Sequence, residues 1–149
     1  MLPARIVNQK RSMDEQSTDD EIAIDACHEF VHICQKNCSG YFGEVKNNWF
    51  WEALATNLGN PECFEWVEEE FDEYIHFDEI KNIVDLNNNM KSGSYKYVYL
   101  IGKYIINNIS HDEILKLIKN EDYCKEKSEE LLKQTKVYAQ KTFSKNKTQ

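Results

Sequence analysis

Hydrophobic residues recur at intervals of three and four through most of this chain, which is the spacing of one face of an α-helix. The first such pattern starts near residues 17–20 and ends at Ser39-Gly40, a typical helix stop. On a helical wheel, four of its apolar positions fall within about 60° of one another. We expect these four to face the core: Cys27, Val31, Cys34 and Cys38.

Two more helices are predicted in the middle of the sequence. One covers about 48–58, with Gly59 suited to a left-handed C-terminal cap. The next covers about 61–76, because Asn60 suits the N-cap and Pro61 the first helical position.

A fourth helix is predicted to begin at Asp78, a typical capping residue, before a polar loop at 87–94. Its inward positions are expected to be Ile80, Ile83 and Val84.

The segment 95–109 is ambiguous, because its tyrosines and β-branched residues also suit a strand. We favour a helix, since its apolar residues keep helical spacing over about three turns. These residues are Val98, Ile101, Ile105 and Ile109.

Two capping signals mark the starts of the last two predicted helices. Ser110 and Glu113 form a capping box at the start of one helix, and Asn120 can cap the last helix, which reaches about Phe143. The sequence therefore predicts an all-α fold, a single-domain bundle of about six or seven antiparallel helices over residues 19–143. Residues 1–18 are predicted to form a flexible N-terminal arm and 144–149 a disordered tail.

Composition narrows the class of protein. The chain has 149 residues, with 26 acidic against 18 basic side chains, a net charge of −8 and only five glycines and two prolines. This negative field repels phosphate backbones, which argues against nucleic acid as a partner. No apolar run is long enough to cross a membrane and no secretory signal is apparent, so we expect a soluble intracellular protein of cytoplasm or nucleus with reduced thiols. Its oligomeric state is not indicated.

Residues 28–32 read His-Glu-Phe-Val-His, which matches the H-E-x-x-H pattern of zinc hydrolases. Positions i and i+4 lie on one side of a helix, so His28 and His32 can reach one zinc ion while Glu29 serves as general base. The wheel, however, places both histidines on the polar side opposite the cysteines. No third ligand is evident either, although Glu62, Glu65 and Glu69 are candidates.

Aromatic and acidic residues between positions 49 and 72 suggest a different function. Three neighbouring aromatics at 49–51 point three ways around a helix, so at least one should lie in a crevice or on the surface. With the acidic run that follows, they resemble a protein-binding surface. Its predicted residues are Trp49, Trp51, Trp66, Glu68, Glu69, Glu70 and Asp72.

Two functional hypotheses follow. The first is a non-enzymatic intracellular adaptor or regulator without a cofactor, which binds a helical or basic segment of a protein partner through that surface. The alternative is a small zinc-dependent hydrolase, resembling a metallopeptidase in its motif, with His28 and His32 as metal ligands and Glu29 as its catalytic base.

Overall fold

The structure is a computed structural model that describes residues 19–60, 62, 64–88 and 93–144. In this part of the chain there are eight α-helices, one short 3₁₀ helix and no strand. The predicted all-α fold is therefore confirmed, with eight helices where about six or seven were expected. The predicted N-terminal arm, and the tail beyond Ser144, lie outside the described residues.

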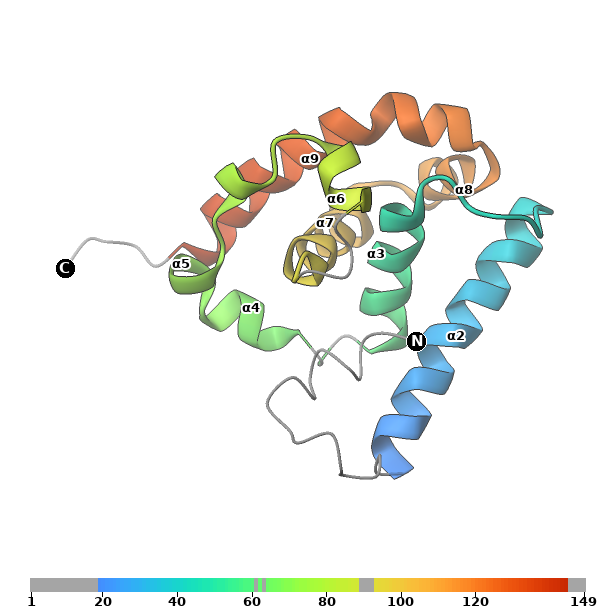
Figure 1. Cartoon of the computed structure of the whole chain (residues 1–149), viewed down its shortest axis with the longest axis horizontal. Coiled ribbons are helices and arrows are strands. Elements are labelled where there is room, and N and C mark those ends of the chain that lie inside the picture. Colours follow the sequence, from blue (N-terminus) through green and yellow to red (C-terminus); the bar gives the residue numbers. More distant parts are fainter. Residues whose placement is uncertain (1–18, 61, 63, 89–92, 145–149) are drawn as a thin grey trace.

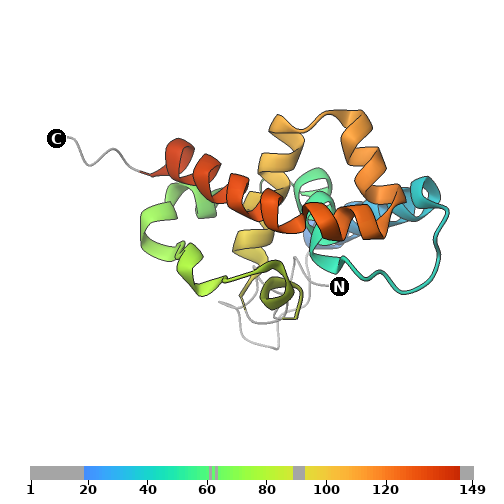
Figure 2. The ribbon, with the colours of Figure 1, turned by 90° about the horizontal axis from the view of Figure 1, so that it is seen from above.

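Helix α7 lies near the centre of the molecule, and the other helices are arranged around it (Figure 1). Helix α3 packs against α2 on one side and against α7 on the other, and α7 in turn packs against α9. Figure 2 shows α9 running along the length of the molecule. The elements are α2 (Asp19–Ser39), α3 (Asn48–Gly59), α4 (Glu65–Glu69), α5 (Phe71–Tyr74), η2 (Phe77–Glu79), α6 (Ile83–Asn88), α7 (Tyr95–Asn108), α8 (His111–Lys119) and α9 (Glu121–Phe143).

Helix α7 supplies the centre of the core. The helical alternative for 95–109 is confirmed, and Val98, Ile101 and Ile105 are completely buried. A strand here would have had no partner for its backbone groups, because the described residues include no other strand. None of the helices in the described ranges is long and apolar enough to cross a membrane.

Two glycines bring α3 very close to its neighbours. A Cβ atom on Gly59 would lie 2.7 Å from the Cα of His28 in α2. A Cβ atom on Gly102 of α7 would collide with the backbone carbonyl of Ala53. The left-handed cap predicted at Gly59 is wrong: Gly59 is the last residue of α3, and the residue is needed for close packing rather than for a positive φ.

The helix predicted over 61–76 is interrupted. Helix α4 ends before Glu70, whose φ of −105° and ψ of 23° leave the helical range, and α5 follows. Tertiary packing explains the break, because Phe64 stacks on Tyr99 of α7 while Phe71 contacts Phe143 of α9. Asn60 follows the C-terminus of α3, and Pro61 lies outside the described residues.

Most other helix ends follow the predicted caps. Gly40 has a φ of 67° after α2, and the side chains of Ser110 and Asn120 accept amide hydrogen bonds at the starts of α8 and α9. Asp78 is an exception, since it lies in η2 and α6 begins only at Ile83. Of the positions expected to face inward, Ile80 and Ile83 do so, whereas Val84 is exposed.

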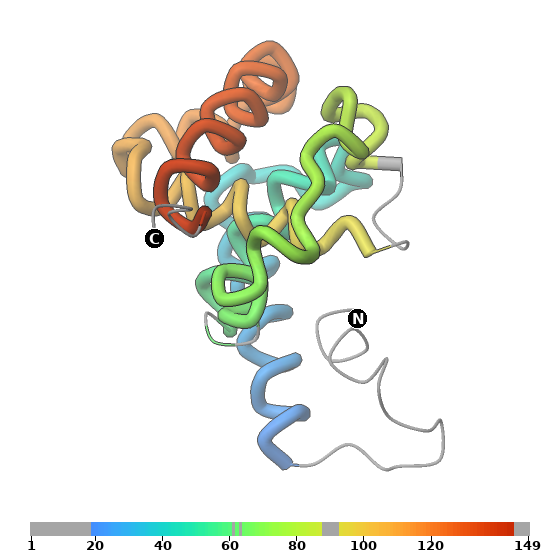
Figure 3. The backbone as a smooth tube through the Cα atoms, turned by 90° about the vertical axis from the view of Figure 1, so that its left-hand side faces the viewer, coloured from blue at the N-terminus to red at the C-terminus, as the bar shows by residue number. Residues whose placement is uncertain are grey.

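The predicted core side of α2 is wrong. Cys27, Cys34 and Cys38 are exposed, whereas His28 and Gln35 are buried. Helix α2 lies at the edge of the molecule, and Figure 3 shows its N-terminal half extending beyond the other helices. The apolar residues of α2 are spread around most of its circumference, so their periodicity does not define one buried side. Polar partners on α3 determine which side of α2 packs against the other helices.

Candidate metal centre

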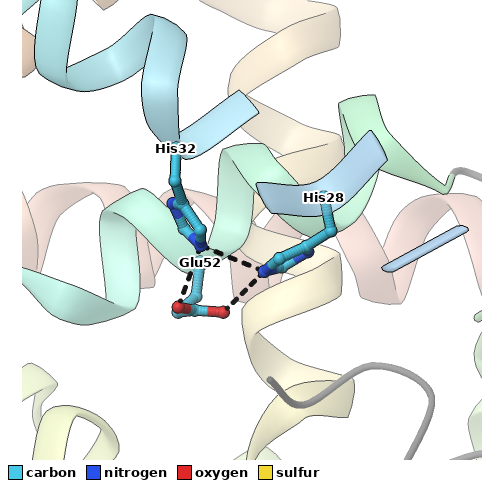
Figure 4. A group of neighbouring side chains, drawn as sticks. All are labelled: His28, His32 and Glu52. Carbon is cyan, nitrogen blue, oxygen red and sulfur yellow. Dashed lines mark hydrogen bonds and ion pairs between the residues drawn. The ribbon is translucent and has the colours of Figure 1, made fainter. Parts of the chain in front are cut away.

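Three polar side chains converge between α2 and α3 (Figure 4). His28 and His32 lie one turn apart on α2, and their Nε2 atoms are 3.0 Å from each other. Glu52 of α3 places one carboxylate oxygen 3.2 Å from the Nε2 of His28 and the other 3.2 Å from that of His32. A metal ion can be held by three or more His, Cys, Asp or Glu side chains that lie close together. Among the residues that the structure describes, these three side chains form such a group.

Hydrogen bonds alone do not satisfy this arrangement. An imidazole Nε2 carries either one proton or one lone pair, so it forms one strong hydrogen bond in the plane of its ring. Each Nε2 nevertheless lies at hydrogen-bond distance from both the other histidine and Glu52. A cation among the three groups would accept both lone pairs and the carboxylate at once.

The distances allow the three side chains to share one metal ion. Bonds of about 2.0–2.1 Å from zinc to its ligands place neighbouring ligand atoms about 3.3 Å apart. The two Nε2 atoms are 3.0 Å apart, and each lies 3.2 Å from a different oxygen of the Glu52 carboxylate. One ligand atom from each residue lies within 4.8 Å of the others, and the carboxylate would turn to bring one oxygen close to both nitrogens.

Neighbouring side chains orient two of the three candidate ligands. Gln35, which is buried, accepts a hydrogen bond from His32 Nδ1 at 2.8 Å and donates from its Nε2 to the Trp51 carbonyl at 3.0 Å. The buried Tyr95 hydroxyl of α7 donates to Glu52 at 3.4 Å. His28 Nδ1 is buried and has no hydrogen-bond partner among the described residues. Hydrogen-bond partners such as Gln35 and Tyr95 fix the direction of the metal ligands that they contact.

The charges of the group are strongly coupled. Burial acts to raise the pKa of Glu52, but hydrogen bonds from His28 and His32 outweigh it and lower that pKa to about 2. Burial acts to lower the pKa of His32, but hydrogen bonds with Glu52 and Gln35 and the charges of Glu52 and Glu29 together outweigh that effect and raise the pKa. Glu52 is therefore a carboxylate at neutral pH, the form that binds metal.

An open cavity of about 510 Å³ adjoins this group. His32 and Glu52 line it, and so does Glu29, the general base predicted from the motif. Helix α3 and the segment that joins it to α2 supply much of the remaining wall, including Val45, Asn48 and Trp51. A ligand in the cavity would thus face two candidate metal ligands and the candidate base.

The structure reverses the sequence prediction that both histidines lie in solvent. His28 is 2% exposed, and the side chain of His32 is 17% exposed. The third member, Glu52, was missed, whereas the sequence candidates Glu62, Glu65 and Glu69 do not join the group. One signal could have found it: Glu52 is the only charged residue within 48–59, and a lone carboxylate in an apolar helix requires a polar partner.

The residues of the predicted protein-binding surface are dispersed. Trp49 and Trp51 are buried, although Trp51 lines the cavity, which agrees with the crevice expected for one of these aromatics. Trp66 is 36% exposed and packs edge-on against Tyr74. Glu68 pairs with Lys103 and accepts a hydrogen bond from Tyr99, while the other acidic members, Glu69, Glu70 and Asp72, are exposed.

Comparison of the chain with protein-family models, with curated proteins and with solved structures gave no match. The function is therefore inferred from the chemistry of the site.

Proposed function

We propose that this protein is a zinc-dependent hydrolase with His28, His32 and Glu52 as its metal ligands and Glu29 as its general base. One observation carries the proposal: the two histidines of the motif and a carboxylate from another helix converge, with one ligand atom from each within 4.8 Å of the others. The motif alone matched five residues of sequence. The third ligand is independent support, because it comes from α3 and was not part of the pattern.

The ligand set favours a catalytic over a structural zinc site. Structural zinc sites have four protein ligands and are closed, whereas catalytic sites have three and leave one position open. Two histidines with one glutamate form a set that zinc peptidases use. Here the open side is provided by the cavity that His32 and Glu52 line.

The reaction that these residues support is hydrolysis of an amide or ester. When bound, zinc would supply Lewis acidity, which polarises a carbonyl group and makes water more acidic. Glu29 takes a proton from water as the water oxygen attacks the scissile carbonyl carbon. The bond to the leaving group then breaks, and Glu29 returns the proton to that group, so one water is consumed per bond cleaved.

Metal content and turnover test the proposal together. Protein purified without chelators should carry about one zinc per chain by mass spectrometry, and it should cleave members of a fluorogenic peptide mixture. Glu29→Gln should keep the zinc and abolish cleavage, since Gln cannot accept the proton. A chain that stays folded but takes up no zinc when it is supplied would refute the proposal.

The adaptor function stays a prediction from the sequence. Burial of Trp49 and Trp51 removes two of the three tryptophans on which it was based. Trp66 and the exposed acidic residues after it still offer a contact for a basic or helical protein segment. Recovery of a stoichiometric partner that is lost on Trp66→Ala would support this function.

A further inference from the structure

The hydrogen bonds of Gln35 determine which of its amide atoms faces His32. The carbonyl oxygen of Trp51 can only accept a hydrogen bond, so the Gln35 atom 3.0 Å from it must be the NH₂ group. The other end of the amide, the Oε1 oxygen, therefore faces His32 Nδ1 at 2.8 Å. Gln35 is 3% exposed, so water does not offer an alternative partner.

This orientation in turn selects a tautomer of His32. An amide oxygen only accepts, so the Nδ1 of His32 must carry a proton. In a neutral imidazole with Nδ1–H, the Nε2 atom has the free lone pair that a metal ion requires. Glu52 has the opposite preference in the absence of metal, because its oxygen 3.2 Å from Nε2 would accept a proton placed there.

We infer that Gln35 is a positioning residue that holds His32 in the Nδ1–H tautomer and so presents its Nε2 to the metal. The inference rests on the proposed metal centre and goes beyond it, since the zinc motif does not include this position. Gln35 lies one turn after His32 on α2, and its second hydrogen bond anchors it to α3. The same side chain thereby ties the two helices together beside the site.

Two substitutions separate this role from simple packing. Gln35→Met keeps the length of the side chain but removes the acceptor, and we expect zinc affinity to fall about ten- to hundredfold. Gln35→Glu keeps an acceptor for His32 but sets a carboxylate oxygen against the Trp51 carbonyl. It should therefore unfold at lower urea concentration than the wild type, yet bind zinc within about threefold of the wild-type affinity or more tightly.

The experiment is a competition titration of metal-free full chain with zinc against a chromophoric chelator. Gln134→Met is the matched control, because Gln134 also accepts a side-chain hydrogen bond but lies on α9. Nitrogen-15 NMR of the metal-free proteins at alkaline pH adds a direct readout: Nδ1 of His32 should be protonated in the wild type, and less so in Gln35→Met.

Unchanged zinc affinity and an unchanged tautomer in Gln35→Met would overturn the inference. So would an equal loss of affinity in Gln35→Met and Gln35→Glu, which would assign Gln35 to packing alone. If the wild type binds no zinc, the proposed function fails, and the tautomer comparison still decides whether Gln35 controls His32.

Discussion

Glu52 adds a third side chain to the two histidines of the sequence motif and completes the metal centre that we propose. It is held by both histidines and by Tyr95, and its depressed pKa keeps it charged. We predict that Glu52→Gln lowers zinc affinity by more than the ten- to hundredfold that loss of an outer partner costs, because a neutral amide is a weak zinc ligand. Equilibrium dialysis against zinc measures this, with the exposed Glu69→Gln as control. Equal loss in both variants would contradict the assignment of Glu52.

Protonation of His32 gives the site a defined pH dependence. In metal-free protein, the raised pKa of His32 stabilises the fold below its unfolded value of 6.5, and this contribution is lost as pH rises through the raised folded value. Zinc acts in the opposite direction, since it competes with that proton. The rise in Tm on adding zinc should therefore be larger at pH 8 than at pH 6, by differential scanning fluorimetry. A zinc effect that is larger at pH 6 would argue against histidine ligands.

At the residue scale, the sequence predicted the chemistry better than the geometry. The spacing of His28 and His32 depends only on local helix structure, so the pair could be recognised in advance. The direction in which they point depends on Glu52, 20 residues beyond His32, and on the Trp51 carbonyl. Such long-range polar contacts leave no periodic signal, and the only hint was a single charge in an apolar helix.

At the scale of helices, the close approach of α3 to α2 places Glu52 under the histidines. We predict that Gly59→Ala destabilises metal-free protein by about 1–3 kcal/mol, because its Cβ would overlap the backbone at His28. The same shift should weaken zinc binding. Urea unfolding measures the stability, and Gly40→Asn is the control, since Asn tolerates a positive φ and nothing lies within 4 Å of its Cβ. Wild-type stability in Gly59→Ala would contradict this packing.

The observed helix boundaries show which of the predicted starts and stops are present in the fold. The caps at Gly40 and Asn120 formed as predicted, because each depends on hydrogen bonds within a few residues. Half of the predicted capping box formed: Ser110 accepts the amide of Glu113, whose carboxylate instead accepts a hydrogen bond from Tyr123. The break at Glu70 did not follow from the sequence, since it results from Phe64 and Phe71 packing against two different helices. The inverted side of α2 has the same cause: tertiary partners outweighed local periodicity.

For the whole molecule, metal binding should couple to stability. A ligand at a hundred times its Kd stabilises the native state by about 2.7 kcal/mol. Since the proposed ligands lie on α2 and α3, we predict that zinc slows amide hydrogen exchange in residues 19–39 and 48–59, with little change in α8. Mass spectrometry with and without zinc measures this. Protection that is confined to other helices would place the metal elsewhere.

The class of fold could be predicted from the whole chain, but the arrangement of the helices could not. Few glycines and prolines and a sustained helical spacing were sufficient to indicate an all-α protein. The order in which α2, α3, α7 and α9 pack depends on contacts between distant segments, including the close approach at Gly102. The site lies between two of these helices, so it became visible only with the fold.

Zinc K-edge X-ray absorption on the loaded protein tests the central claim most directly. The account predicts a first shell of nitrogen and oxygen atoms only, at about 2.0–2.2 Å, with the multiple scattering of two imidazoles. Cys27, Cys34 and Cys38 are the competing ligands, since all three are exposed on the same helix. Sulfur scatterers at about 2.3 Å would contradict the assignment of His28, His32 and Glu52 as the metal centre.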